Sequence, residues 1–120
     1  MLAIDTQLYK MSFEMMDIIV NAQDNLPRNI RHTIGQRMIN DAYELTTLII
    51  RAFNTRNGKS DIVAEVHSKV ESLGVGYRLL SKHRFISRKR QARLLELLSE
   101  MTKQSSAWLR KELGKIPNES

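Results

Sequence analysis

Apolar side chains recur every three or four residues along most of this chain. The first such series contains Ile4, Leu8, Met11, Met15, Ile18 and Ala22. Steps of three and four residues place side chains on one face of an α-helix, whereas the two faces of a strand alternate at every residue. Three more series with helical spacing follow, and no strand candidate is longer than a few residues. The pattern therefore predicts an all-α fold.

Capping residues and turn signals set the limits of the first two helices. Asp5 or Thr6 can cap the first helix by accepting hydrogen bonds from free backbone N–H groups. Pro27 disfavours helical geometry at Leu26, so this helix is expected to end near Asp24. The second helix is expected to begin at about residue 28. Its predicted buried face contains Ile30, Ile34, Met38, Ala42, Leu45, Ile49 and Ala52.

The last two helices follow the turn signal Asn57-Gly58. Ser60 can cap the third helix, in which Gly74 and Gly76 are expected to allow a neighbouring helix to approach closely. Its predicted buried face contains Ile62, Val66, Val70, Leu73, Tyr77 and Leu80. Ser87 can cap the fourth helix, which is expected to end around residues 113–114. Its predicted buried face contains Leu94 or Leu95, Leu98, Met101 or Thr102, Ser105, and Trp108 or Leu109.

The length of 120 residues fits one domain and is too short for two. Four helices of about 20 residues joined by short turns predict an antiparallel up-down-up-down four-helix bundle. We assign this domain to residues 1–114 and predict that residues 115–120, which include Pro117, form a disordered tail. Surplus apolar side chains indicate a subunit contact, and hence a homo-oligomer, at Met16, Ile19, Tyr43 and Ile50.

The sequence contains no recognisable set of catalytic or metal-binding residues. There is no cysteine, and His32, His67 and His83 lack metal-ligand spacing. Gly74 and Gly76 are not accompanied by the other residues of a phosphate-binding loop. We therefore expect a protein that is not an enzyme and that uses no metal or cofactor. No apolar run approaches the roughly 20 residues of a membrane span, so we expect no membrane association and a place in the cytoplasm.

Positive charge is concentrated in one segment. The net charge is +6, of which the first sixty residues contribute +1 and the remainder +5. No Asp or Glu occurs from Ser72 to Leu95, although basic residues that merely solvate helix faces would have acids among them. Such a segment predicts an anionic partner. Its basic residues are Arg78, Lys82, Arg84, Arg88, Lys89, Arg90 and Arg93, and Arg28 and Arg31 could extend it if the bundle brings the start of the second helix alongside.

Three stretches together resemble a known family. LPRNIRHTIGQRM (Leu26–Met38) is similar to the start of helix two in the accessory variability determinant (Avd) proteins of diversity-generating retroelements. The run Tyr77–Arg93 is similar to that family's basic turn between helices three and four, and AWLRK (Ala107–Lys111) to its closing Gly-Trp-hydrophobic-Lys. The order and spacing of these stretches match over residues 4–113. One departure is Ser105-Ser106-Ala107, where the family often has glycines.

The resemblance implies a non-catalytic accessory protein that forms a ring-like homopentamer with a basic surface. It also implies association with the element's reverse transcriptase and with nucleic acid during mutagenic copying of a template repeat. Phosphate contacts carry no sequence information, so binding to RNA or DNA would be largely non-specific. Two alternatives are a bundle protein of the type encoded in ribosomal RNA intervening sequences, and a protein-interaction bundle that binds an acidic partner.

Overall fold

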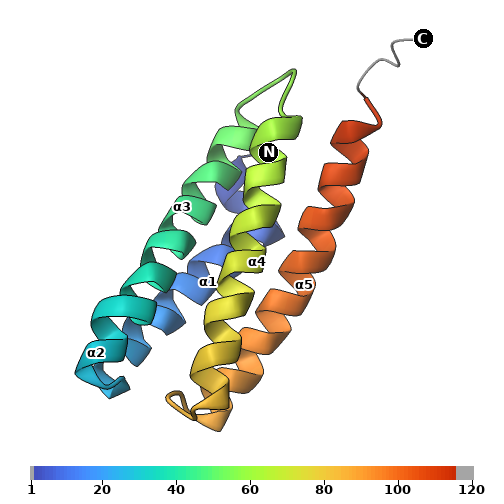
Figure 1. Cartoon of the computed structure of the whole chain (residues 1–120). Coiled ribbons are helices and arrows are strands. Elements are labelled where there is room, and N and C mark those ends of the chain that lie inside the picture. The colour runs from blue at the N-terminus through green and yellow to red at the C-terminus, as the bar shows by residue number, and fades with distance from the viewer. Residues whose placement is uncertain (1, 116–120) are drawn as a thin grey trace.

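The computed structural model describes residues 2–115, and within them the fold consists of helices without any strand (Figure 1). The long helices are α1 (Gln7–Ala22), α3 (Gln36–Phe53), α4 (Ser60–Lys82) and α5 (Arg88–Leu113), which form a four-helix bundle. The all-α prediction is confirmed. Apart from Lys115, the predicted tail lies outside the described residues. No helix in this part of the chain is long and apolar enough to cross a lipid bilayer.

Side-chain caps begin two of the long helices as expected. The Thr6 hydroxyl accepts a hydrogen bond from the backbone N–H of Tyr9 at 3.2 Å, and the Ser87 hydroxyl accepts one from Arg90 at the same distance. The prediction for Ser60 is wrong. Lys59 occupies the cap position without a side-chain hydrogen bond, and Ser60 is already the first residue of α4.

The second predicted helix contains an interruption that its spacing does not reveal. The short α2 (Arg28–Ile30) passes into a π-helical segment, η3 (Arg31–Gly35), before α3 begins. A Cβ at Gly35 would collide with the side chain of Gln23 and lie 3.0 Å from Leu26 Cδ1. The absent side chain therefore lets the end of α1 and the following turn pack directly against the π-helical segment.

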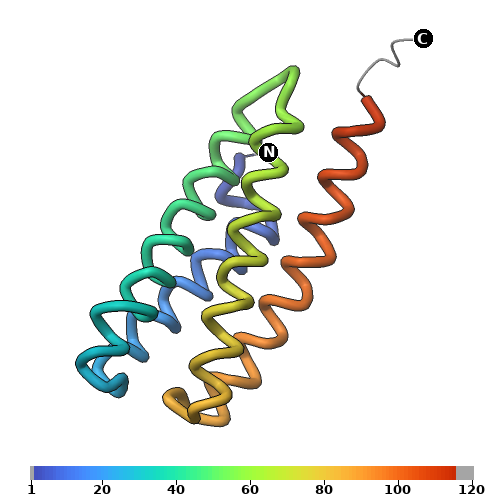
Figure 2. The backbone as a smooth tube through the Cα atoms, in the orientation of Figure 1, coloured from blue at the N-terminus to red at the C-terminus, as the bar shows by residue number. Residues whose placement is uncertain are grey.

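Each long helix packs along two others. Both α1 and α4 contact α3 and α5, so α1 and α4 lie diagonally across the core. Contacts between α1 and α5 run in opposite sequence order, from Gln7 with Gln104 to Glu14 with Arg93. The backbone trace in Figure 2 brings the turn between α1 and α2 and the turn between α4 and α5 to one end of the bundle. The α3–α4 connection lies at the other end.

The core follows most of the predicted faces, but α1 is shifted, and the faces predicted for the last two helices omit the buried Val63 and Leu97. Ile4 is 50% exposed and Ile18 is half-buried, whereas Ile19 is only 3% exposed and joins the core. The interpretation of Ile19 as surplus surface is therefore wrong. The core cluster consists of Leu8, Met11, Met15, Ile19, Ala22, Leu26, Met38, Ala42, Leu45, Leu48, Ile49, Val66, Val70, Leu73, Leu80, Ile86, Leu94, Leu97, Leu98 and Met101.

The two glycines of α4 have different surroundings. A Cβ at Gly76 would lie 2.7 Å from Met38 Cγ, which confirms the predicted close approach between α4 and α3. A Cβ at Gly74 would meet nothing within 4 Å. Gly74 therefore faces outward, and the prediction of close packing there is wrong.

Candidate nucleic-acid interface

The fold brings the two basic parts of the sequence to the same end of the bundle. Lys82 ends α4, Arg84 lies in the turn from α4 to α5, and the first turn of α5 contains Arg88 and Lys89. The start of α2 contains Arg28. Figure 1 shows α2 and the α4–α5 turn at this end, which we call the basic end. Of the two residues expected to extend the basic segment, Arg28 thus lies at this end.

Several cations of the basic end are available to a ligand. Lys82, Arg84, Arg88, Lys89 and Arg28 are exposed, and their side chains form no salt bridge or hydrogen bond with another residue of the described 2–115 range. Like charges that lie close together without acidic partners repel each other and create a positive potential. The basic end is thus suited to a polyanion.

The turn that carries Arg84 has a defined backbone geometry. Arg84 has a φ of 58°, in the left-handed region that usually favours glycine. The N–H of Phe85 donates to the carbonyl oxygen of Leu80 at 2.9 Å. The N–H of Arg84 donates to the carbonyl oxygen of Ser81 at 3.1 Å. This pair of bonds is the Schellman motif, which ends a helix and satisfies its last carbonyls. The motif holds Arg84 at the tip of the turn, where its side chain is exposed.

A polar hollow of about 320 Å³ lies beside this turn, lined by Ser81, Arg84, Ile86, Arg88 and Gln91. The Ser81 hydroxyl is buried and has no hydrogen-bond partner among the described residues. The hollow opens next to the start of α5, where free backbone N–H groups favour an anion. Two arginine side chains and a helix start therefore border one space, while the Ser81 hydroxyl is buried behind it.

Two of the predicted basic residues are already engaged by α1. Arg90 Nη2 donates to the backbone oxygen of Asn21 at 3.3 Å. Arg93 bonds to both oxygens of Glu14, with Nη2 at 2.7 Å from Oε1, and its Nη1 lies 3.0 Å from Glu96 Oε2. The hydrogen bond from Arg93 lowers the pKa of Glu14 below its ordinary value. The expectation of uncompensated charge is therefore wrong at Arg93.

Arg31 and Arg78 lie apart from the exposed group. Arg31 is half-buried, and its Nη2 donates to the backbone oxygen of Leu26 at 3.3 Å, so it helps to hold the turn before α2. Arg78 is exposed and lines a groove between α4 and α5. Neither residue is placed among the free cations at the tip of the bundle.

One polar constellation joins residues that the sequence keeps far apart. His67 Nδ1 lies 2.8 Å from the Ser105 hydroxyl, and His67 Nε2 lies 3.3 Å from Glu71 Oε1. The order of groups is that of a nucleophile, base and orienting acid. Ser105, however, is 0% exposed, and its hydroxyl also donates to the backbone oxygen of Thr102. A buried hydroxyl does not reach a substrate, so this constellation joins α4 to α5.

The comparison with protein families decides the identification. A sequence model described as bAvd-like matches residues 4–112. The chain belongs to the bAvd-like family. Searches of curated proteins and of solved structures find no match. Family membership agrees with the resemblance carried by Leu26–Met38, and the structure gives a physical reason for the Ile34-Gly35 step in that stretch. In this bAvd-like chain a side chain at position 35 would displace the end of the Gln23 side chain and crowd Leu26.

Proposed function

We propose that this bAvd-like protein is a non-catalytic accessory protein of a diversity-generating retroelement. In this role it binds the backbone of RNA or DNA and the cognate reverse transcriptase, and so supports mutagenic synthesis of complementary DNA. Membership of the family supports the association with such an element. The basic end of the bundle supports the contact with nucleic acid.

The observation that carries the proposal is the group of cations at the basic end that have no partner among residues 2–115. Arg84, Arg88 and Lys89 lie at the turn from α4 to α5, and Arg28 lies at the start of α2. Three of them border or adjoin a helix start, where positive charge is unfavourable unless an anion is present. A phosphate group at this end would remove the repulsion among the cations and accept hydrogen bonds from them. The hollow beside Ser81 provides space for one such group.

We propose that the binding is insensitive to sequence. Contacts to phosphate fix the position of a nucleic acid without reading its bases. Phe85 is half-buried and stacks on His83 at 5.5 Å between ring centres, so it does not offer both faces to a base. Affinity should therefore depend on charge and ionic strength more than on base composition.

Fluorescence anisotropy with labelled RNA and DNA oligonucleotides of mixed sequence tests this proposal. The logarithm of the association constant should fall steeply with the logarithm of the salt concentration, and oligonucleotides of different sequence should bind within about tenfold of each other. An affinity that stays constant from low to moderate salt would contradict the proposal. A protein that binds no nucleic acid but binds the purified reverse transcriptase would instead identify an acidic protein surface as the partner.

We further propose an up-down-up-down bundle that assembles into a ring-like homopentamer. The opposite sequence order of the contacts between α1 and α5 supports this helix arrangement. Apolar side chains that remain exposed on α1 and α3, such as Phe13 and Tyr43, support a subunit contact. Light scattering on the purified protein tests the assembly, because a mass near 13.9 kDa would correspond to one chain.

A further inference from the structure

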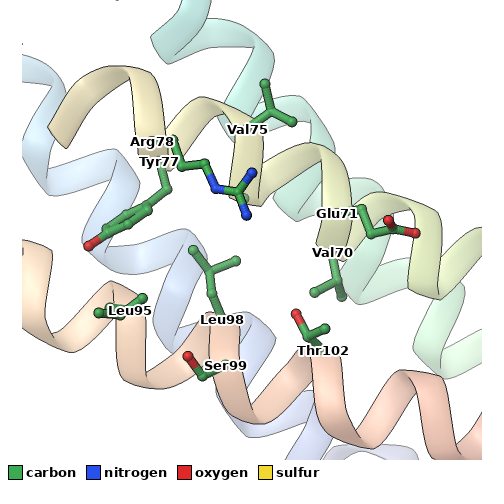
Figure 3. A pocket seen from close by; sticks show the side chains of 10 residues that line it. Val70, Glu71, Val75, Tyr77, Arg78, Leu95, Leu98, Ser99 and Thr102 are labelled. Carbon is green, nitrogen blue, oxygen red and sulfur yellow. The ribbon is translucent and has the colours of Figure 1, made fainter. Parts of the chain in front are cut away.

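A groove with an apolar floor follows the outer side of α4 and α5. It has a volume of about 440 Å³ and includes Gly74 and Val75 from α4 and Leu95 from α5. Val75 is 65% exposed and Leu95 is 52% exposed, so two large apolar side chains that line one groove are open to solvent. Figure 3 shows Leu98 and Thr102 along one side of the groove and the side chain of Arg78 extending over it. Gly74 contributes no side chain, so the groove is open at its centre.

The outer face of α1 carries exposed side chains, two of them large and apolar. Phe13 is 51% exposed and projects from this helix, and Val20 further along is 47% exposed. Lys10 and Asp17 are also exposed. Residues at positions 10, 13, 17 and 20 lie on one side of an α-helix because they are spaced by three and four residues. The face is therefore a ridge with an aromatic side chain between a cation and an anion.

The ridge and the groove match in spacing and in charge. The ridge contains Lys10, Phe13 and Asp17, and the α4 side of the groove contains Glu71, Gly74 and Arg78. Both sets are separated by three and then four residues. In sequence order Lys10 corresponds to Glu71, and Asp17 corresponds to Arg78, so each end combines opposite charges. The phenyl ring of Phe13 corresponds to Gly74 in the middle.

The two sets also lie at the same level along the bundle. The contacts of α5 with α1 place Arg93 at Glu14 and Gln104 at Gln7. The contacts of α5 with α4 place Gln91 at Tyr77 and Ser105 at His67. Residues in the middle of α1 are thus level with residues in the second half of α4, and the two helices run in the same direction. Two copies placed side by side in the same orientation would bring ridge and groove into register.

We propose that α1 of a second copy of this chain docks into the groove between α4 and α5. In this contact Phe13 of one copy covers Gly74 of the other, Lys10 pairs with Glu71, and Asp17 pairs with Arg78. The contact rests on the self-association included in the proposed function and assigns a surface to it. Nucleic acid fits the groove poorly, because its floor is apolar and Glu71 would repel phosphate.

The contact joins two different surfaces and is therefore head-to-tail. Because α1 and α4 lie diagonally across the core, their outer faces point away from each other and cannot meet within one chain. Every copy would offer a ridge to one neighbour and a groove to another, an arrangement that forms rings when the rotation between copies closes. Arg78, which the sequence assigns to the basic segment, then belongs to the contact between copies.

Exchange of one charge pair tests the contact. Lys10→Glu and Glu71→Lys should each place like charges together and weaken self-association by about tenfold or more. The double variant Lys10→Glu/Glu71→Lys restores opposite charges and the net charge of the chain, so it should recover the mass of the unmodified protein in sedimentation velocity. Equal assembly of all four proteins, or failure of the double variant to recover while it remains folded, would overturn the proposal. The melting temperature of each variant reports folding, since Glu71 also lies 3.3 Å from His67.

Disulfide formation provides an independent test because the natural chain contains no cysteine. Under mild oxidation the variant Phe13→Cys/Val75→Cys should form dimers and larger species linked by disulfides, whereas Phe13→Cys alone and Val75→Cys alone should remain single chains. Links in either single variant would indicate a symmetric contact and overturn the head-to-tail arrangement. The absence of links in the double variant would overturn the contact itself.

The outcome can be separated from that of the proposed function. Self-association is measured without nucleic acid, and Lys10 and Glu71 are not part of the basic end. If the charge exchange has no effect on assembly but RNA binding depends on salt as expected, the docking contact fails and the proposed function stands. If the charge exchange behaves as expected but no nucleic acid binds, the contact stands and the role of the basic end fails.

Discussion

Arg93 in α5 holds Glu14 in α1 through two hydrogen bonds, from Nε to Oε2 and from Nη2 to Oε1. The two residues are 79 positions apart, so the pair fixes the position of α5 against α1 along the bundle axis. It also removes one guanidinium group from the positive charge of the basic segment. The roles of neighbouring arginines in that segment therefore differ, and substitutions can separate them.

The pair should make stability depend on acidic pH. Since Arg93 lowers the pKa of Glu14 below its ordinary value of 4.5 in the folded protein, the stabilisation is present above that value and is lost as pH falls through the lowered pKa. Glu14→Gln should therefore reduce the loss of melting temperature below pH 4.5. The exposed Glu65→Gln serves as a control. Identical acid profiles for Glu14→Gln and the natural protein would contradict this prediction.

Neutralising free cations at helix starts should separate binding from stability. The triple variant Arg28→Gln/Arg88→Gln/Lys89→Gln should bind RNA more weakly, and the removal of each cation that touches a phosphate should reduce the log–log salt slope by about 0.7 to 0.9. Its melting temperature should hold or rise, because positive charge is unfavourable where a helix begins. Arg90 and Arg93 are left unchanged because both bond to α1.

A control for this variant removes the same charge elsewhere. Arg51, Lys103 and Arg110 are exposed and lie away from the basic end, so their replacement by Gln gives an equal net charge. If this control loses as much affinity as the triple variant, net charge decides binding and the basic end does not. Unfolding of the triple variant would show a structural role for its three residues.

The two glycines of α4 should respond oppositely to alanine. Gly76→Ala places a methyl group against Met38 and should lower the free energy of unfolding by about 1 to 3 kcal/mol. Within one chain Gly74→Ala has open space, so at concentrations at which the protein is a single chain it should raise this free energy by roughly 0.5 to 1 kcal/mol through better helix propensity. Urea denaturation measures both values. A gain in both variants would mean that Met38 does not pack tightly against Gly76, and a loss in both would mean that Gly74 lacks the open space.

Asp41 should be the most sensitive charged residue of the core. It is 3% exposed, and it accepts a hydrogen bond from Ser72 Oγ at 2.7 Å while Lys69 Nζ lies 3.5 Å away. Asp41→Ala removes the acceptor for these two groups and for Arg37 Nε, which lies 3.5 Å from Oδ2, and should lower the free energy of unfolding by about 3 kcal/mol. Glu44→Ala breaks the other, more exposed pair of Lys69 and should cost less than about 1 kcal/mol. Equal losses in urea denaturation would refute the assigned network.

Arg84→Gly should raise stability and weaken binding at the same time. The left-handed backbone at Arg84 costs a residue with a Cβ roughly 1 kcal/mol or more, and glycine has no such cost. The same substitution removes a cation from the basic end. Arg84→Ala is the matched variant, because it removes the cation and keeps the strained backbone. RNA affinity should fall equally in both variants, whereas only Arg84→Gly should melt at a higher temperature.

The spacing of apolar residues is sufficient to predict the helices but not their exact rotation. Thr6 and Ser87 cap helices as expected, because a cap depends on residues within a few positions. Ile19 lies in the core in place of the predicted Ile18 because of the rotation of α1 about its own axis. Such rotation is decided by packing against other helices, which the pattern of a single helix does not contain.

The candidate site is predictable only in part for the same reason. The basic segment is local in sequence, so its cations can be named without knowledge of the fold. The partners of Arg93 and the unpaired hydroxyl of Ser81 depend on residues brought together by folding. The same holds for the ridge at Phe13, whose meaning depends on a groove that two other helices form.

The number of residues in the π-helical segment from Arg31 to Gly35 sets the orientation of the residues that precede it. A π-helical turn contains one residue more than an α-helical turn, and one residue corresponds to a rotation of about 100° around the helix axis. Deletion of one residue from the segment would restore a continuous α-helix and turn Arg28 toward another side of the bundle without altering the charge of the protein. The direction in which Arg28 points therefore depends on the number of residues in the π-helical segment. Insertions and deletions change this number, whereas substitutions do not.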